Sequence, residues 1–244
     1  MGTAGPDQGL RVDLVRRAAS LTATVNDLAL DHLEGRRTPG FDLVGSGTAA
    51  IDAGFDRLEP LSTRVMCSVI PLLTFNPWDP AEELNQRSID RGVELRTVVG
   101  ERSLAANPLL SSLDQTVRIG HAVTTLYLVD RVRAVLPGPL NHDGSATAWT
   151  ATNPEVLTPT LELWDLIWES SRPIVPEGEA APFTPRQVRT AVLLARGAKD
   201  TSIARELGVS VRTVVSEVAT IAARLGATSR LDAAAILRNG RGRP

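Results

Sequence analysis

Residues 183–230 read FTPRQVRTAVLLARGAKDTSIARELGVSVRTVVSEVATIAARLGATSR, and this stretch decides the fold of the C-terminal part of the chain. Thr184 and Gln187 have the spacing of a capping box, in which a hydroxyl and an amide each satisfy a backbone N–H of the first helical turn. Pro185 stands at the first helical position, where its missing N–H has no partner to lose. The sequence therefore predicts a helix that begins here and stops at Gly197.

Two further helices follow within a few residues. A short helix is expected over residues 200–207, and a longer one over residues 211–225. Gly208 can adopt the positive φ of a tight turn between them, and Ser210 can cap the longer helix. Two helices joined by so short a turn predict a helix-turn-helix, and a fourth helix, over residues 230–238, is expected to brace it.

The third helix of this module is expected to have one buried face and one open face. Its larger apolar residues are separated by four, three and four positions, which at about 100° per residue puts them on one narrow stripe: Val214, Val218, Ile221 and Leu225. The opposite face carries side chains that are mostly small or compact: Arg212, Val215, Ser216, Ala219, Thr220 and Ala223. Such a face allows the helix backbone to approach the floor of a DNA groove closely.

Charge is shared unevenly between the two parts of the chain. From Phe183 onward there are 11 basic and 4 acidic residues, a net charge of +7, which leaves 15 basic and 24 acidic residues, a net charge of −9, in the first 182 positions. The overall charge of −2 conceals this division. The asymmetry predicts a nucleic-acid-binding module attached to an acidic domain.

The C-terminal module resembles the LuxR-type DNA-binding domain over about a quarter of the chain. The residues that carry the resemblance are Phe183-Thr184-Pro185-Arg186, Arg196-Gly197, Ile203-Ala204, Leu207-Gly208-Val209-Ser210, Arg212-Thr213-Val214, Arg224-Leu225-Gly226 and Ser229-Arg230. The resemblance implies that the third helix enters the major groove of double-stranded DNA, where base edges can be told apart, while basic residues around it hold phosphates.

Individual DNA contacts follow from the resemblance by position. The residues expected to face base edges are Val215, Ser216 and Ala219. Phosphate contacts are expected from Lys199, Arg212 and Arg224, with Thr213 as a hydroxyl donor. Thr201, Thr220 and Arg230 complete the expected DNA-binding set.

Two positions depart from the family pattern. The family usually has a basic residue at the position of Val215 and often a histidine at the position of Glu217. Each lost contact removes about 1–3 kcal/mol, and a carboxylate near DNA repels it. Val215 can contact a thymine methyl instead, so we expect an altered sequence preference more than a loss of binding.

A long amphipathic helix is expected near the N-terminus. No Pro or Gly interrupts residues 10–33, where apolar residues recur at helical spacing: Leu14, Ala18, Leu21, Val25, Leu28 and Ala29. Residues 1–9 are expected to be disordered, and residues 36–47, which carry Gly and Pro, are expected to form a linker. DNA-binding modules of this size usually act as dimers, so this helix, within residues 1–41, is the expected homodimerisation element.

Helical and strand patterns alternate through residues 42–173, which is the rhythm of an α/β layer. Helices are expected near residues 48–58 and 80–91 and from residue 154 or 158 to residue 170, and strands at residues 64–70, 93–99, 124–129, 131–136 and 146–150. Residues 174–182 are expected to be a linker. The expected fold is therefore an α/β N-terminal domain preceded by a long helix, plus an all-α four-helix C-terminal domain over residues 183–244.

The segment of residues 42–173 resembles the truncated phospholipase-D-like domain of actinobacterial and TrmB-like regulators. The resemblance is carried by Ser88-Ile89-Asp90-Arg91-Gly92-Val93-Glu94-Leu95-Arg96, Leu128-Val129-Asp130-Arg131, Ala134-Val135-Leu136-Pro137 and Leu163-Trp164-Asp165-Leu166-Ile167-Trp168-Glu169. It implies a regulatory domain. Catalysis in that superfamily needs a histidine followed two residues later by a lysine, whereas His121 is followed by Val123, and the only lysine is Lys199. We therefore expect no enzyme activity.

Other ionisable residues suggest no further chemistry. A single cysteine, Cys67, excludes an internal disulfide and fits a reducing cytoplasm. His32, His121 and His142 lack the spacing of metal ligands, so we expect neither a metal nor another cofactor. No stretch approaches the ~18 consecutive apolar residues that span a bilayer, so we expect no membrane contact.

Two functions fit these patterns. The first is a sequence-specific transcription regulator that binds double-stranded DNA, with an N-terminal domain that binds a small-molecule or protein effector and so biases DNA binding. The second is a protein-interaction regulator with a degenerate DNA-binding face, which acts by docking onto another transcription factor. A gel-shift experiment with its own promoter region distinguishes the two.

Overall fold

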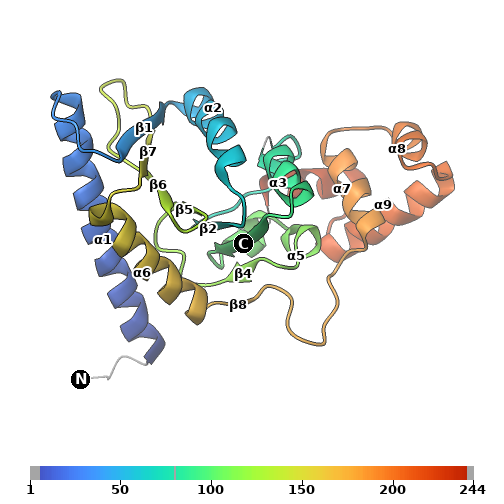
Figure 1. Ribbon diagram of the computed structural model, residues 1–244. Helices are drawn as coiled ribbons and strands as arrows, with labels where there is room; N and C mark the ends of the chain where they lie inside the picture. Colours follow the sequence, from blue (N-terminus) through green and yellow to red (C-terminus); the bar gives the residue numbers. More distant parts are fainter. Residues whose placement is uncertain (1–5, 80, 241–244) are drawn as a thin grey trace. The chain divides into compact units, whose positions relative to one another are not determined.

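The computed structural model describes residues 6–79 and 81–240 (Figure 1). The chain divides into two compact units. The N-terminal unit consists of Met1–Pro71, Ala81–Val99 and Gly120–Ser171, and the C-terminal unit consists of Leu72–Pro80, Gly100–Ile119 and Arg172–Pro244. Since each unit is assembled from three separate stretches, the polypeptide passes from one unit to the other five times along its sequence.

A mixed β-sheet forms the centre of the N-terminal unit. Its strands follow the order β1-β7-β6-β5-β2-β3, with all neighbours antiparallel except β2 and β3, which are parallel. A parallel pair needs a crossover, and the helix α3 (Ala81–Asp90) provides it. The strands are β1 (Phe41–Ser46), β2 (Val65–Ile70), β3 (Glu94–Val99), β5 (Leu126–Val129), β6 (Arg133–Pro137) and β7 (Thr147–Ala151).

Helices cover both faces of this sheet. Successive residues of β6 alternate between the two faces, because side chains along a strand point to opposite sides: Ala134 and Leu136 join the core beneath α1 (Pro6–Leu33) and α6 (Pro154–Ser170), whereas Val135 packs with α2 (Thr48–Leu58). Figure 1 shows α1 and α6 side by side. A short 3-10 helix, η1 (Glu59–Leu61), follows α2.

The predicted apolar stripe of α1 is confirmed as a buried surface. All six of its residues pack within the N-terminal unit, on α6 and the sheet: Leu14, Ala18, Leu21, Val25, Leu28 and Ala29. This stripe is therefore already occupied within one copy of the chain and is not available to pair two copies. Residues 1–9 were expected to be disordered. Residues 1–5 lie outside the described residues, and for residues 6–9 the prediction is wrong, because α1 begins at Pro6.

The α/β pattern predicted for residues 48–170 is confirmed, but the expected linker at residues 36–47 is wrong, because β1 occupies half of it. Gly45 contributed to the prediction of a linker, but it lies in a strand and is required there by a close contact. A Cβ atom at this position would lie 2.4 Å from the carbonyl oxygen of Ala50, so only glycine lets α2 pass this close to the strand. Short elements were also missed: α4 (Ser103–Ala106), α5 (Leu110–Leu113), β4 (Arg118–Ile119) and β8 (Arg172–Pro173).

A buried carboxylate holds the turn between β5 and β6. Asp130 and Arg131 both have left-handed backbone conformations, with φ of 50° and 60°. The Asp130 carboxylate accepts hydrogen bonds from the N–H and the hydroxyl of Thr63, at 3.0 and 2.6 Å, and from the N–H groups of Arg64 and Val65, at 2.8 and 2.9 Å. Burial alone would raise the pKa of Asp130, but these four hydrogen bonds lower it to about 2.

We predict that this carboxylate makes the stability of the N-terminal unit depend on pH. Because the pKa falls from 3.8 to about 2 on folding, the stabilisation is complete above pH 3.8 and is lost as the pH falls towards 2. Asp130→Asn is expected to lower the free energy of unfolding by about 1–2 kcal/mol at pH 7. Urea unfolding at pH 7, 5 and 2.5 measures this, and a deficit that stays constant down to pH 2.5 would contradict it.

Four helices of the C-terminal unit match the predicted module: α7 (Pro185–Ala195), α8 (Asp200–Leu207), α9 (Val211–Leu225) and α10 (Arg230–Asn239). The capping box is present, because the Thr184 hydroxyl accepts from the N–H of Gln187 and the Gln187 side chain accepts from the N–H of Thr184. Gly208 ends α8 with φ of 65°, and the Ser210 hydroxyl caps α9. The helix-turn-helix prediction is confirmed.

The core of this module includes residues that come much earlier in the sequence. Phe75 and the fully buried Leu109 belong to the same apolar cluster as the four helices. Two hydrogen bonds add to this contact: the N–H of Phe183 donates to the Ser112 hydroxyl at 3.0 Å, and Nε of Arg196 donates to a backbone carbonyl, that of Pro77, at 2.8 Å. The helix-turn-helix is thus built on a small support formed by residues 72–79 and 100–119.

Candidate nucleic-acid interface

The two faces of α9 differ as the sequence predicts. Val214, Val218, Ile221 and Leu225 are buried. On the opposite face Val215 is 52% exposed, and Ser216 and Ala219 are exposed as well. The helix therefore presents a line of small side chains to the surroundings, and its backbone is accessible along this line.

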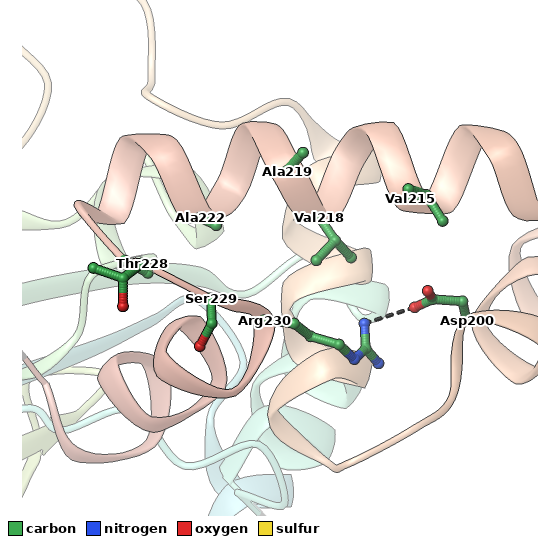
Figure 2. Close-up of a pocket in the computed structure, with 9 residues that line it drawn as sticks. Asp200, Val215, Val218, Ala219, Ala222, Thr228, Ser229 and Arg230 are labelled. Atoms are coloured by element: carbon green, nitrogen blue, oxygen red, sulfur yellow. Dashed lines mark hydrogen bonds and ion pairs between the residues drawn. The ribbon is translucent and has the colours of Figure 1, made fainter.

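A hollow lies beside this outer face. Figure 2 shows Val215, Ala219 and Ala222 along α9, opposite the start of α10, where Ser229 and Arg230 lie. The wall on the side of α9 is apolar, whereas the wall on the side of α10 carries hydroxyl groups. Ala222 and Ser229 were not predicted as site residues, although Ala222 follows Ala219 by three positions and so falls close to the same side of a helix.

Three basic side chains of the predicted set are exposed: Lys199, Arg212 and Arg224. Lys199 precedes α8, and Arg212 lies in the first turn of α9. Arg224 lies in the last turn of α9, with its guanidinium carbon 5.7 Å from the centre of the Phe183 ring. The basic groups thus lie near the ends of the two helices, and the small side chains lie between them on α9.

The predicted threonines are part of the local hydrogen bonding. The Thr213 hydroxyl lies 2.8 Å from the hydroxyl of Ser210, at the N-terminus of α9. Thr220 donates its hydroxyl hydrogen to the carbonyl oxygen of Ser216, at 3.0 Å. Thr201 is exposed in the first turn of α8. A phosphate contact by Thr213 would therefore share its hydroxyl with the capping interaction.

Arg230 already has protein partners. Its Nη1 donates to the Asp200 carboxylate at 2.6 Å, the interaction drawn as a dashed line in Figure 2, and its Nη2 donates to the carbonyl oxygen of Ala198. These bonds join the start of α10 to the start of α8. Asp200, which the sequence did not single out, is therefore the residue that fixes the orientation of the Arg230 guanidinium.

Glu217 corrects an expectation about DNA repulsion. This residue is 9% exposed and lies on the inner side of α9, where its Oε1 is 2.9 Å from Nε and 2.7 Å from Nη2 of Arg186 on α7. The carboxylate was expected near DNA because it stands where the LuxR-type family often has a histidine. It is instead paired within the module, so Val215 is the one departure from the family pattern that lies on the outer face.

The N-terminal unit has a stacked pair of tryptophans next to its core. Trp164 is buried in the core, and its ring stacks on Trp168 with centroids 5.3 Å apart. Among residues 6–79 and 81–240, no group of His, Cys, Asp and Glu has the arrangement of a metal site. In the same described part of the chain, no helix is both long and apolar enough to span a bilayer.

Comparisons with known proteins agree with this description of the C-terminal unit. Residues 181–237 match the family model described as "Bacterial regulatory proteins, luxR family", so they form a LuxR-family helix-turn-helix domain, as the sequence predicted. No curated protein matches the chain.

Two of the solved structures similar to the chain align with somewhat more than half of it. These are Nuc from Salmonella typhimurium, described as a phospholipase D family member (14% identity, TM-score 0.42, 56% of this chain and 98% of that chain), and NucT from Helicobacter pylori (9% identity, TM-score 0.44, 55% and 98%). A third is TrmBL2, described as an archaeal chromatin protein (10% identity, TM-score 0.41, 64% of each chain).

Proposed function

We propose that this chain, with its LuxR-family helix-turn-helix domain at residues 181–237, is a sequence-specific transcription regulator that binds double-stranded DNA. The observation that carries the proposal is the outer face of α9, where Val215, Ser216 and Ala219 are exposed while the opposite stripe is buried. A helix of this kind fits the major groove, which is wide enough to admit it and in which each base pair presents a distinct pattern.

Val215, Ser216 and Ala219 are proposed to contact base edges. The Ser216 hydroxyl can donate to or accept from a base, and the methyl groups of Val215 and Ala219 suit the methyl group of thymine. Lys199, Arg212 and Arg224 are proposed to contact phosphates, together with the hydroxyls of Thr201, Thr213 and Thr220. Arg230 is proposed to add positive charge to this surface while it holds α8 and α10 together.

We predict that Arg212→Ala weakens binding to every duplex about equally. The side chain is exposed at the N-terminal turn of α9, and the loss of one phosphate contact should flatten the slope of log K against log salt concentration by about one. Fluorescence anisotropy at several salt concentrations, with a specific and a random duplex, measures both effects. Arg189→Ala, at an exposed position of α7, is the matched control, and equal slopes for the two variants would refute the assignment.

The competing proposal, a protein that docks onto another regulator through a degenerate DNA-binding face, is weakened by Glu217. That proposal depended on two departures, and the pairing of Glu217 with Arg186 leaves Val215 alone. A gel shift with the promoter region of the chain's own gene in moderate salt tests it. A retarded band that random DNA does not remove favours direct DNA recognition, and no retarded band favours docking.

The segment of residues 42–173 is proposed to be a regulatory domain that binds a small-molecule or protein effector and biases DNA binding through residues 183–244. We propose no hydrolytic role for it, because hydrolysis by this superfamily needs a lysine two residues after a histidine. Val123 stands at that position after His121, and the one lysine of the chain, Lys199, precedes α8 in the helix-turn-helix. A change in DNA affinity on addition of a small-molecule extract of the producing cells would support an effector. A homodimer is also part of the proposal.

A further inference from the structure

The helix α1 has a second apolar stripe that points away from the core. Its large residues are Val12, Val15, Leu30 and Leu33, which are 63%, 50%, 51% and 64% exposed. Between these two pairs the exposed residues Ala19, Thr22 and Ala23 continue the line. At about 100° per residue, all seven fall within about 100° of the helix circumference, next to the stripe that packs on α6 and the sheet.

The order of residues along this stripe is nearly symmetrical about the midpoint between Thr22 and Ala23. Val12 and Leu33 are equally far from that midpoint, and so are Val15 and Leu30. Large apolar residues thus lie at both ends. Between them lie the small residues and the half-buried Asn26, which falls within the same arc and would face the partner's Ala19. Two copies related by a two-fold axis at the midpoint would place Val12 against the partner's Leu33 and Val15 against the partner's Leu30, which is a self-complementary contact.

The charges beside the stripe favour the same, antiparallel arrangement. Within the bounds of α1, residues 6–20 carry three arginines and two aspartates, a net charge of +1, whereas residues 21–33 carry two aspartates, a net charge of −2. Antiparallel pairing brings the basic half of each helix against the acidic half of the other, and parallel pairing would bring like charges together. Arg16 and Asp27 border the stripe on the same side, near the level at which the two copies would face each other.

We propose that two copies of this chain pair through the outer stripe of α1, antiparallel, with the two-fold axis between Thr22 and Ala23. The occupant of this face is therefore a second copy of the same chain. The inference rests on the homodimer that is part of the proposed function and assigns its interface. Because it is tested without DNA, its failure would leave the proposal of DNA binding untouched.

Analytical ultracentrifugation of the full chain over a concentration series tests the pairing. The wild type is expected to sediment as a dimer that dissociates on dilution, and Val15→Lys and Leu30→Glu are each expected to raise the dissociation constant at least about tenfold, because each places a charge against an apolar residue at two symmetrical positions. Val132→Lys and Leu140→Glu, at exposed apolar positions elsewhere in the N-terminal unit, are the matched controls and should leave it unchanged. A wild type that is monomeric throughout, or variants as dimeric as the controls, overturns the proposal.

Mixing the two variants tests the antiparallel register. In an antiparallel pair formed from one Val15→Lys chain and one Leu30→Glu chain, the lysine faces the glutamate at one end, and Val15 faces Leu30 at the other. The mixture should therefore associate more tightly than either variant alone. A chain that carries both substitutions separates the two registers, because in an antiparallel pair each lysine faces a glutamate, whereas in a parallel pair lysine faces lysine and glutamate faces glutamate. A double variant that associates no more tightly than the single variants overturns the register.

Cysteine cross-linking gives a second readout that does not depend on charge. The one native cysteine, Cys67, is buried, so an added surface cysteine is the reactive one. Thr22→Cys lies beside the proposed axis and should form a covalent dimer on mild oxidation, whereas Leu33→Cys should not, because its counterpart lies at the far end of the partner's helix. Efficient cross-linking of Leu33→Cys with none of Thr22→Cys overturns the proposal, and melting curves of all variants confirm that the fold is intact.

Discussion

Ala219→Glu is expected to weaken specific DNA binding by about a hundredfold or more, with little change in stability. Ala219 is exposed in the middle of the outer face of α9, between the turns that carry Val215 and Ala223. A glutamate there would hold the helix away from the groove floor and bring a carboxylate next to phosphates. Losing base contacts at about 1–3 kcal/mol each and adding repulsion together give an effect of this size.

The experiment uses duplexes that the wild-type protein selects from a random pool, with affinity measured by fluorescence anisotropy. Ala49→Glu is the matched control, because it adds the same side chain at an exposed alanine in the first turn of α2, in the other unit. Thermal unfolding of both variants checks that the fold is retained. Affinity within about threefold of the wild type for Ala219→Glu would mean that α9 does not lie in the groove, because an added side chain would then be tolerated.

Leu109→Ala is expected to destabilise the helix-turn-helix by about 2–5 kcal/mol, although it lies 74 positions before Phe183 in the sequence. Leu109 is fully buried in the apolar cluster of α7–α10, so truncation to alanine leaves a cavity there. DNA binding should fall in parallel at temperatures where the unit begins to unfold, and it should recover on cooling.

Urea unfolding of the C-terminal unit measures this effect. A single fluorescent label attached to α9, read at a wavelength at which tryptophan does not emit, makes the signal come from that unit. Leu104→Ala is the matched control, because Leu104, in the neighbouring α4, is 40% exposed and its truncation should cost less than about 1 kcal/mol. Equal losses for the two variants would show that Leu109 does not support the helices.

The sequence predicted the elements that local signals define. The capping box of Thr184 and Gln187, the positive φ of Gly208 and the spacing of Val214, Val218 and Ile221 each act within a few residues, so α7, α8 and α9 could be located without a structure. The apolar spacing in α1 was equally clear. It defined a buried stripe, although its partner turned out to be α6 and the sheet of the same copy.

What the sequence did not predict depends on contacts between distant positions. Gly45 has the composition of a linker, and only the approach of Ala50 shows why a strand carries glycine there. Glu217 follows Val214 by three positions, which puts it at the edge of the buried stripe, but nothing near it in the sequence identifies Arg186 as its partner. The contribution of Phe75 and Leu109 to the helix-turn-helix core was invisible for the same reason.

The contacts of Phe75, Leu109 and Ser112 with the helix-turn-helix have a consequence for limited proteolysis. Pro176, Gly178 and Ala180 are exposed just before the module, so a protease can cut there. The two fragments would still be joined by the apolar cluster and by the hydrogen bond from Phe183 to Ser112. A nicked chain would therefore be expected to elute as a single species, so severing this peptide segment would not by itself release the helix-turn-helix from the rest of the chain.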